Sequence, residues 1–312
     1  MEIFSTTANQ ILFLFLLIAI GFGLTKAGVI KDETATILGT LESLLLMPAV
    51  ILKSLMENCT VTNLAPMGKI VLAGAIAQLG AIAFALLVGR KFSKERFLRN
   101  SYIYGFCFSN GGYMGNAVML ALFPNLFFAY IIFTIPMTIA TYMWGVPVLL
   151  SNEDKKISMK ERLKSFVNPM CLSVVIGMVL GMLEVPVPLA VGNTISALAD
   201  CMSPIAMLLI GIAVANAGFK KIFTIPRTYV ATLFRLLVMP LLVIGVLYLM
   251  KPSEDIAILS ACWMAMPVGL NPLIMASAYE RDTTENAGLV IVSHLLSFLT
   301  IPLIITIIET CV

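Results

Sequence analysis

Two short stretches rich in asparagine, glycine and proline interrupt long apolar runs in this sequence. The first is Ser-Asn-Gly-Gly-Tyr-Met-Gly-Asn at residues 109–116, inside the apolar run 98–123. The second is Met-Pro-Val-Gly-Leu-Asn-Pro at residues 266–272, inside the run 256–279. Glycine and proline weaken or end the helices that such runs would otherwise form. Because non-helical backbone in lipid is tolerated only where it is buried in protein or lines a cavity, each stretch predicts a site.

The chemistry that these breaks could support is the binding of a small anion. A broken helix presents the positive end of one half-helix and the negative end of the other to the gap between them. Asparagine amides add donors and acceptors, which suit a carboxylate together with a hydroxyl group or an ion. The predicted substrate-binding residues are Asn110, Gly111, Gly112, Gly115, Asn116, Pro267, Gly269, Asn271 and Pro272.

Two of these residues are expected to contact the substrate directly. Asn110 opens the glycine-rich break, and Asn271 precedes Pro272, whose missing N–H frees a carbonyl one turn earlier. The alternative is that the amides only satisfy backbone groups that the breaks leave free.

Charged residues inside apolar runs are further candidates, because they are rare in membranes and face the protein interior. Asp200 and Arg235 lie at similar depth, near the middle of a roughly 30 Å hydrocarbon core, and are predicted to pair. The pair could be structural, or it could take part in substrate binding or proton coupling, and Glu42 is a weaker candidate for the same roles. Lys53 is expected to extend to the membrane surface. His294 is expected to pack with a hydrogen bond rather than to relay protons.

The composition indicates the elements that must position these residues. The chain has 312 residues, of which 60% are hydrophobic and 12% charged, so it is predicted to be an all-α polytopic membrane protein. At roughly 20 residues a crossing, ten spans are expected at 8–25, 35–56, 67–89, 98–123, 127–150, 168–183, 189–215, 225–250, 256–279 and 287–308. Nothing in the sequence indicates a nucleic-acid partner, a metal cluster, a phosphate-binding loop or an enzyme's nucleophile.

The distribution of basic residues predicts the orientation. Most of the 20 lysines and arginines fall in the first, third, fifth, seventh and ninth connections, whereas the opposite connections hold only Lys69 and Lys251. By the positive-inside rule, the odd connections are cytoplasmic and both termini are outside the inner (plasma) membrane. Residues 1–150 and 166–312 then each contain five spans and must be inverted relative to each other. Residues 151–165 are a cytoplasmic linker.

Matching residues in the two halves support a duplicated unit. They recur at offsets of 155 or 156 residues: Cys107 and Cys262, Asn116 and Asn271, Pro147 and Pro302, Gly21 and Gly177, and Pro48 and Pro204. Two inverted five-helix repeats with a broken helix in each half are the plan of several secondary transporters. The broken fourth and ninth helices are therefore expected to cross near the midplane.

At these residues the chain resembles the auxin efflux carrier family, which includes plant PIN transporters and bacterial permeases annotated for malate or malonate. The segment 108–115 is similar to the family's glycine-rich break, residues 267–271 to its Pro-x-x-x-Asn, and residues 296–303 to its tenth helix. The resemblance covers nearly the whole chain. Ala117 departs from it, because many members have proline there, and His294 stands where a small hydroxyl residue is expected.

The resemblance implies a secondary transporter of small organic anions, such as malate, malonate or auxin-like acids. It also implies an elevator-like movement of helices 3–5 and 8–10 against scaffold helices 1, 2, 6 and 7, and a homodimer formed through the scaffold. No cofactor is expected, and coupling to Na⁺ or H⁺ is left open. The alternatives are a sodium-coupled symporter with the fold of bile-acid transporters and NhaA, and a transporter-like sensor that binds its ligand without moving it.

Overall fold

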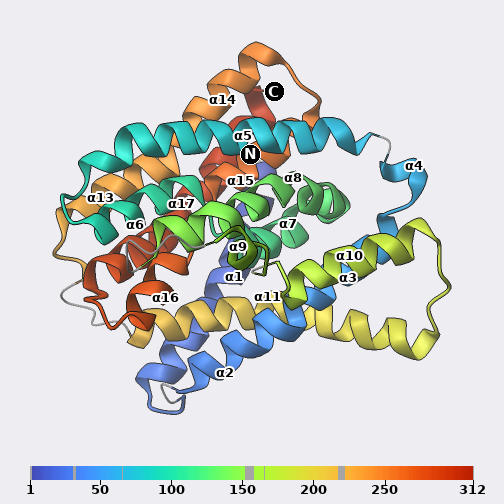
Figure 1. Ribbon diagram of the computed structural model, residues 1–312, viewed down its shortest axis with the longest axis horizontal. Helices are drawn as coiled ribbons and strands as arrows, with labels where there is room; N and C mark the ends of the chain where they lie inside the picture. The colour runs from blue at the N-terminus through green and yellow to red at the C-terminus, as the bar shows by residue number, and fades with distance from the viewer. Residues whose placement is uncertain are drawn as a thin grey trace.

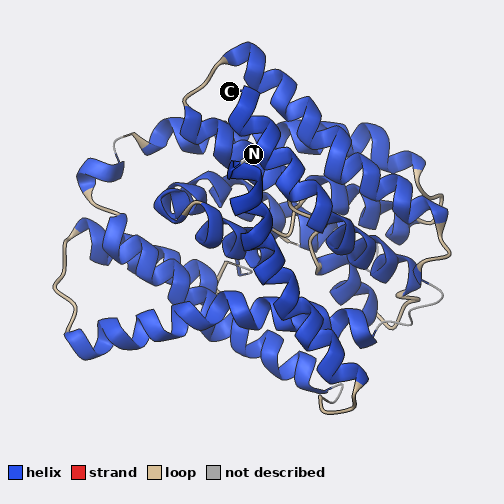
Figure 2. Ribbon diagram, turned by 180° about the vertical axis from the view of Figure 1, so that it is seen from behind, coloured by secondary structure: helices blue, strands red, loops and turns tan. Residues whose placement is uncertain are grey.

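The protein folds as an assembly of helices. A computed structural model describes residues 2–30, 33–64, 66–151, 158–164, 166–216 and 222–311. Within these residues every regular element is a helix, and the only extended pairing is one antiparallel bridge between Ser109 and Val268 (Figure 2). The all-helical prediction is confirmed.

The helices follow the predicted spans closely. In the first half they are α1 (Glu2–Lys26), α2 (Glu33–Leu41), η1 (Glu42–Leu46), α3 (Met47–Asn58), α4 (Val61–Leu64), α5 (Met67–Val88), η2 (Gly89–Lys91), α6 (Arg96–Cys107), η3 (Gly111–Gly115), α7 (Asn116–Leu122), η4 (Pro124–Leu126), α8 (Phe127–Ala140) and η5 (Thr141–Leu149). In the second half they are α9 (Met159–Lys164), α10 (Pro169–Met182), α11 (Leu189–Asn216), α13 (Pro226–Leu233), η6 (Phe234–Val238), α14 (Met239–Met250), α15 (Glu254–Ala265), α16 (Asn271–Ala278) and α17 (Thr284–Cys311).

The lengths of these helices fit a polytopic membrane protein. Among the described residues, six segments are long and apolar enough to cross a membrane: Ile37–Asn58, Met67–Lys91, Pro124–Leu149, Leu189–Asn216, Pro226–Met250 and Thr284–Thr310. Two shorter apolar helices cover Leu12–Lys26 and Pro169–Met182. The two other apolar runs of the sequence are the broken ones, α6–α7 and α15–α16.

Wide helical turns occur at three of the candidate positions. The elements η1, η3 and η6 are π-helical and contain Glu42, the glycine-rich stretch and Arg235, respectively. A π-helical turn is rare and often marks a functional site, because the extra residue in the turn shifts the direction of the side chains. All three turns lie within predicted spans.

The helices pack in two groups (Figure 1). Helices α1, α3, α10 and α11 pack on one another, and in both ribbon views α3, α10 and α11 lie together at one side of the molecule. The second group contains α5, α6, α8, α13, α14, α15 and α17, which also contact one another. The groups meet where α1 contacts α17 and where α11 contacts η3 and α7.

Glycines allow close approach of the helix backbones inside each group. A Cβ atom at Gly21 of α1 would overlap the carbonyl oxygen of Leu208 in α11, and one at Gly211 would overlap that of Ile18. Gly74 of α5 approaches α8 in the same way. Small residues at helix contacts are typical of membrane proteins, where van der Waals packing drives association.

Candidate functional site at two crossing helix breaks

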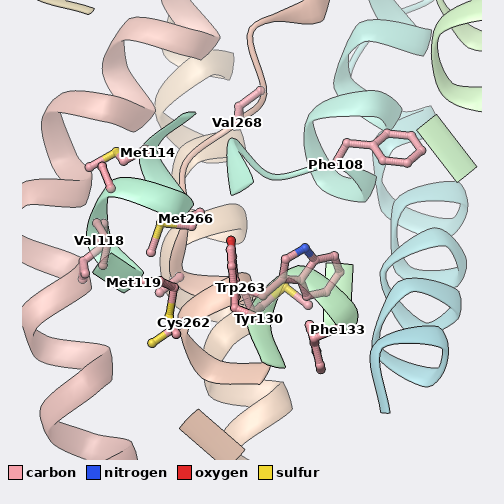
Figure 3. Close-up of a cluster of buried hydrophobic side chains, with 14 of the residues drawn as sticks. Phe108, Met114, Val118, Met119, Tyr130, Phe133, Cys262, Trp263, Met266 and Val268 are labelled. Atoms are coloured by element: carbon pink, nitrogen blue, oxygen red, sulfur yellow. The ribbon is translucent and has the colours of Figure 1, made fainter. Parts of the chain in front are cut away.

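The two breaks lie against each other, as their sequence predicts. Ser109 and Val268 form the antiparallel bridge, and the Asn110 N–H donates a hydrogen bond of 2.7 Å to the Pro267 carbonyl. Figure 3 shows Val268 with Met266, Trp263 and Tyr130 below it in the view, so the crossing is surrounded by large side chains. Backbone groups that the breaks free are thus satisfied across the crossing, inside protein rather than in lipid.

A second hydrogen bond mirrors the first. The Gly269 N–H donates to the Phe108 carbonyl at 3.1 Å. Gly269 follows Asn110 by 159 residues, and Pro267 follows Phe108 by the same interval. The two bonds therefore exchange when the two segments are swapped, as the two bonds of any antiparallel bridge do. The offset of 155 expected from Cys107 and Asn116 does not hold at the crossing.

The position of each break differs from the prediction. The first half-helix ends at Cys107, and only residues 108–110 are non-helical, because Gly111–Gly115 already form the π-helical turn that leads into α7. In the second half the non-helical residues are 266–270, and Asn271 begins α16. Pro272 thus stands in the first turn of α16, where its missing N–H leaves no helical partner unsatisfied. The expectation that Pro272 frees a carbonyl of the preceding helix is wrong.

The glycines of the first break make room for one side chain. A Cβ atom at Gly115 would overlap the Tyr130 hydroxyl, and one at Gly111 would lie 3.1 Å from it. The Tyr130 hydroxyl donates a 3.2 Å hydrogen bond to the Gly111 carbonyl. Gly112 faces Met47 of α3 with ordinary contact distances. The glycines therefore serve close approach of Tyr130 rather than an unwound chain.

Asn110 is held by the histidine of α17. Its Nδ2 lies 2.8 Å from Nε2 of His294, and Nδ1 of His294 lies 2.8 Å from the Val290 carbonyl. Because a carbonyl can only accept, Nδ1 carries the ring proton, and Nε2 of the neutral ring accepts from Asn110. The expected hydrogen-bonded packing role of His294 agrees with this geometry.

Asn271 also forms a side-chain hydrogen bond. Its Nδ2 donates to the Tyr104 hydroxyl at 2.5 Å. The amide N–H of Val268 is satisfied by the Ser293 hydroxyl at 3.2 Å, so α17 supports both breaks. The sequence analysis did not include Tyr104 or Tyr130 among the site residues. A tyrosine in an apolar run does not reveal which group its hydroxyl will hydrogen-bond.

Asn116 differs from the other two asparagines. The residue is 6% exposed, and the hydrogen bonds of the described residues include none to its amide group. Its amide atoms are not among the fully buried atoms that lack a partner, so they keep some accessible surface. Of the predicted amides, Asn116 is the one left open to a ligand.

Arg235 binds the C-terminal ends of α6 and α15, the two half-helices that precede the breaks. Its Nε donates to the Met266 carbonyl at 3.1 Å and its Nη1 to the Phe106 carbonyl at 3.2 Å. The side chain is fully buried, and its Nη2 has no partner among the described residues. The C-terminal ends of α6 and α15, which carry partial negative charge, thus converge on one fixed cation.

The predicted pairing of Asp200 with Arg235 is wrong. Asp200 lies 3.6 Å from Lys53 of α3, and its side chain is 76% exposed. The two residues lie on different helices and point in different directions. Arg235, in η6, points toward α6 and α15 of the second group, whereas Asp200, in α11, faces Lys53 of α3. Lys53 therefore has an ion-pair partner in the protein, and its expected extension to the membrane surface is not its only interaction.

Lys53 and Asp200 line a polar cavity of about 300 Å³. Its other walls come from α7, η4 and α8, including Leu120, Pro124 and Asn125. Leu120 is one turn after Asn116, on the same face of α7. The cavity therefore opens between the two groups of helices, about one turn of helix from the open amide.

Glu42 is a buried carboxyl group without a described partner. Its side chain is 0% exposed, and neither oxygen has a hydrogen-bond partner in the described part of the chain. The turn η1 that contains it contacts α10 and α11, so Glu42 lies within the first group of helices.

The chain was compared with protein families and with curated proteins. A search of curated proteins found no match to the chain. The family model described as "Membrane transport protein" matches residues 6–305, which is nearly the full length. The predicted resemblance to auxin efflux carriers is confirmed by this match. With its apolar helices and paired helix breaks, the chain belongs to the membrane transport protein family of auxin efflux carriers.

Proposed function

We propose that this protein is a secondary transporter of small organic anions, with carboxylates such as malate, malonate or auxin-like acids as the substrate class. The observation that carries the proposal is Arg235, a buried cation that binds both broken helices and has no carboxylate partner among the described residues. Its Nη2, which has no partner among the described residues, is a charged donor from which a carboxylate could accept. The open amide of Asn116 adds donors that a carboxylate could accept from.

The proposed architecture is ten spans in two inverted repeats. A pair of contacts away from the crossing supports it. Gly21 approaches Leu208, and Gly177 approaches Leu52, with its Cβ position 3.4 Å from the Leu52 carbonyl oxygen. Both glycines and both leucines are 156 residues apart. In this proposal the halves are 1–150 and 166–312, and residues 152–157 and 165 of the linker 151–165 lie outside the described residues.

The proposed mechanism is an elevator-like movement between the two groups of helices. Their membership supports it, because α1, α3, α10 and α11 correspond to the expected scaffold and the second group to the expected transport helices. The polar cavity at Lys53 and Asp200 lies between the groups and would be one route to the crossing. The homodimer formed through the scaffold is part of the same proposal.

The proposed location is the inner membrane, with both termini outside. Ion pairs between residues of the lysine- and arginine-rich connections support this orientation. Arg227 pairs with Glu285 at 2.8 Å and Arg281 with Glu95 at 3.3 Å, so the connections before α6, α13 and α17 meet at one end. These are three of the connections expected to be cytoplasmic.

Sodium coupling at the crossing is disfavoured. The negative ends of α6 and α15 would suit a cation, but Arg235 already occupies them and would repel Na⁺. Glu42 is the better candidate for coupling, to a proton, because a buried carboxyl group with no partner is stable only when neutral.

The test is a thermal-shift screen of purified protein with mono- and dicarboxylates, followed by uptake and counterflow of the stabilising acid in proteoliposomes. A ligand that binds only the folded state raises its apparent stability. Uptake that is equal with and without a sodium gradient supports the proposal. Binding without counterflow would favour the sensor, and uptake that requires sodium would favour the symporter.

A further inference from the structure

A second cavity lies away from the crossing, between α5 and α14. It has a volume of about 470 Å³ and is closed at its base by α15. Its walls are almost entirely apolar, with Leu72, Ile76 and Phe84 on one side and Val246 and Leu247 on the other. This volume is within the usual range of about 300–1,000 Å³ for ligand sites. The cavity is large enough for an apolar ligand.

The cavity exists because α5 has small residues on the face toward α14. Ala73, Ala77, Gly80 and Ala81 all line it. A Cβ atom at Gly80 would have no neighbour within 4 Å, so the space there is open. On an adjoining face α5 packs tightly on α8 through Gly74. The groove is therefore a feature of the outward face of α5.

Two basic residues stand at one end of this groove. Lys69 lines it directly, and Lys251 lies between Met250 and Pro252, which both line it. These are the only lysines or arginines in the connections on their side of the predicted membrane. Both side chains are exposed, and neither forms an ion pair with Glu254 or with any other described residue. Lys69 and Lys251 thus stand at the mouth of the groove, with Glu254 and Asp255 in the same connection as Lys251, and the body of the groove is apolar.

We propose that this groove binds a phospholipid, with one acyl chain along α5 and the phosphate at Lys69 and Lys251. The groove extends along α5 from Lys69 to Phe84, 15 residues further on, which is a rise of about 22 Å. This exceeds half of a roughly 30 Å hydrocarbon core, so an acyl chain that starts at the headgroup level fits along it. Paired lysines near a membrane surface favour anionic lipid.

A second copy of this chain would be a different occupant of the same face. It is less suited to the groove, because Lys69 and Lys251 have like charge and lie at the same end. A small polar ligand is also unsuited, since among the described residues that line the groove Ser260 is the only polar one besides Lys69. The inference does not depend on the transported substrate.

The test is native mass spectrometry and thermal shift of the purified protein with dioleoyl phosphatidylglycerol, dioleoyl phosphatidylcholine and glycerol phosphate. We expect phosphatidylglycerol to be retained at least tenfold more than phosphatidylcholine, and glycerol phosphate to cause no shift. Gly80→Phe fills the groove and should reduce retention of both lipids at least tenfold. Gly245→Phe is the matched control, because Gly245 also has open space around it but does not line the groove.

A second variant separates the headgroup from the acyl chain. Lys69→Gln with Lys251→Gln should remove the preference for phosphatidylglycerol while leaving retention of phosphatidylcholine unchanged. Equal retention of phosphatidylglycerol by Gly80→Phe and the wild type would overturn the proposal. So would a Gly80→Phe protein that changes its oligomeric state but keeps its lipid, because the groove would then be an interface between copies.

Discussion

Arg235 and Met266 are joined by a hydrogen bond of 3.1 Å from the guanidinium Nε to the carbonyl that follows α15. The same guanidinium binds Phe106 at the end of α6. One side chain therefore fixes the relative position of both first half-helices. Its charge offsets the partial negative charge of two helix ends at once.

Arg235→Gln should destabilise the protein. It loses two charge-assisted hydrogen bonds, each worth roughly 1.5–3 kcal/mol, so we expect the free energy of unfolding to fall by about 3 kcal/mol. Arg235→Lys should recover less than half of this loss, because an ammonium group lacks the planar fork that reaches two carbonyls. Unfolding in mixed detergent micelles measures both variants. An unchanged free energy for Arg235→Gln would show that Arg235 does not hold the half-helices.

Lys53 and Asp200 should contribute little to stability. The Asp200 side chain is 76% exposed and the pair is separated by 3.6 Å. Exposed pairs of this kind are worth about 0–1 kcal/mol. A double-mutant cycle of Lys53→Gln and Asp200→Asn should give a coupling free energy below about 1 kcal/mol, and a cycle of Asp200→Asn with Arg235→Gln should be additive. A coupling of several kcal/mol in the second cycle would contradict the observed partners.

The glycine-rich turn provides a prediction with an internal control. Gly115→Ala should lower the free energy of unfolding by about 1–3 kcal/mol, because its methyl group would overlap the Tyr130 hydroxyl. Combining it with Tyr130→Phe should relieve most of the loss, measured as a favourable coupling in a cycle. Gly192→Ala is the control, since nothing lies near the added methyl group there. A similar loss from Gly115→Ala in both backgrounds would mean that helix geometry, not Tyr130, requires glycine.

These contacts show how far the sequence predicted the structure. Hydropathy located the helices well, because a span of roughly 20 apolar residues leaves few alternatives; α11, for example, begins at the expected Leu189 and ends one residue after the expected Ala215. Composition also indicated that each of the two runs is broken, but the non-helical residues are 108–110 and 266–270 rather than the whole predicted stretches. It could not predict the partners of Asp200 or Arg235, because similar depth says nothing about which face of a helix a side chain occupies. Nor could it tell that the glycines accommodate Tyr130, a residue of another helix.

Asn110 and His294 should be coupled in stability. Their side chains lie 2.8 Å apart in a buried site. Hydrogen bonds between membrane helices average about 0.6 kcal/mol and reach about 1.7 kcal/mol. A cycle of Asn110→Ala and His294→Ala should give a coupling free energy in this range. Additive losses in thermal unfolding would mean that the two side chains do not interact in the folded protein.

The last prediction separates ligand binding from structural support among the asparagines. Asn110 and Asn271 already have partners in His294 and Tyr104, so their substitution by alanine should lower the melting temperature. Asn116→Ala removes no described hydrogen bond and should leave the melting temperature nearly unchanged. If Asn116 contacts the substrate, its loss leaves a desolvated ligand group unmatched, at about 1–3 kcal/mol, or roughly tenfold or more in affinity.

The measurement for this comparison is the affinity for the stabilising carboxylate and the melting temperature of the same preparation. Asn193→Ala, at an exposed position on α11, is the matched control and should change neither quantity. Normal affinity in Asn116→Ala would place the substrate away from this amide. A reduced melting temperature in the same variant would mean that Asn116 supports the fold, because the amide would then have a structural partner whose loss the protein cannot replace.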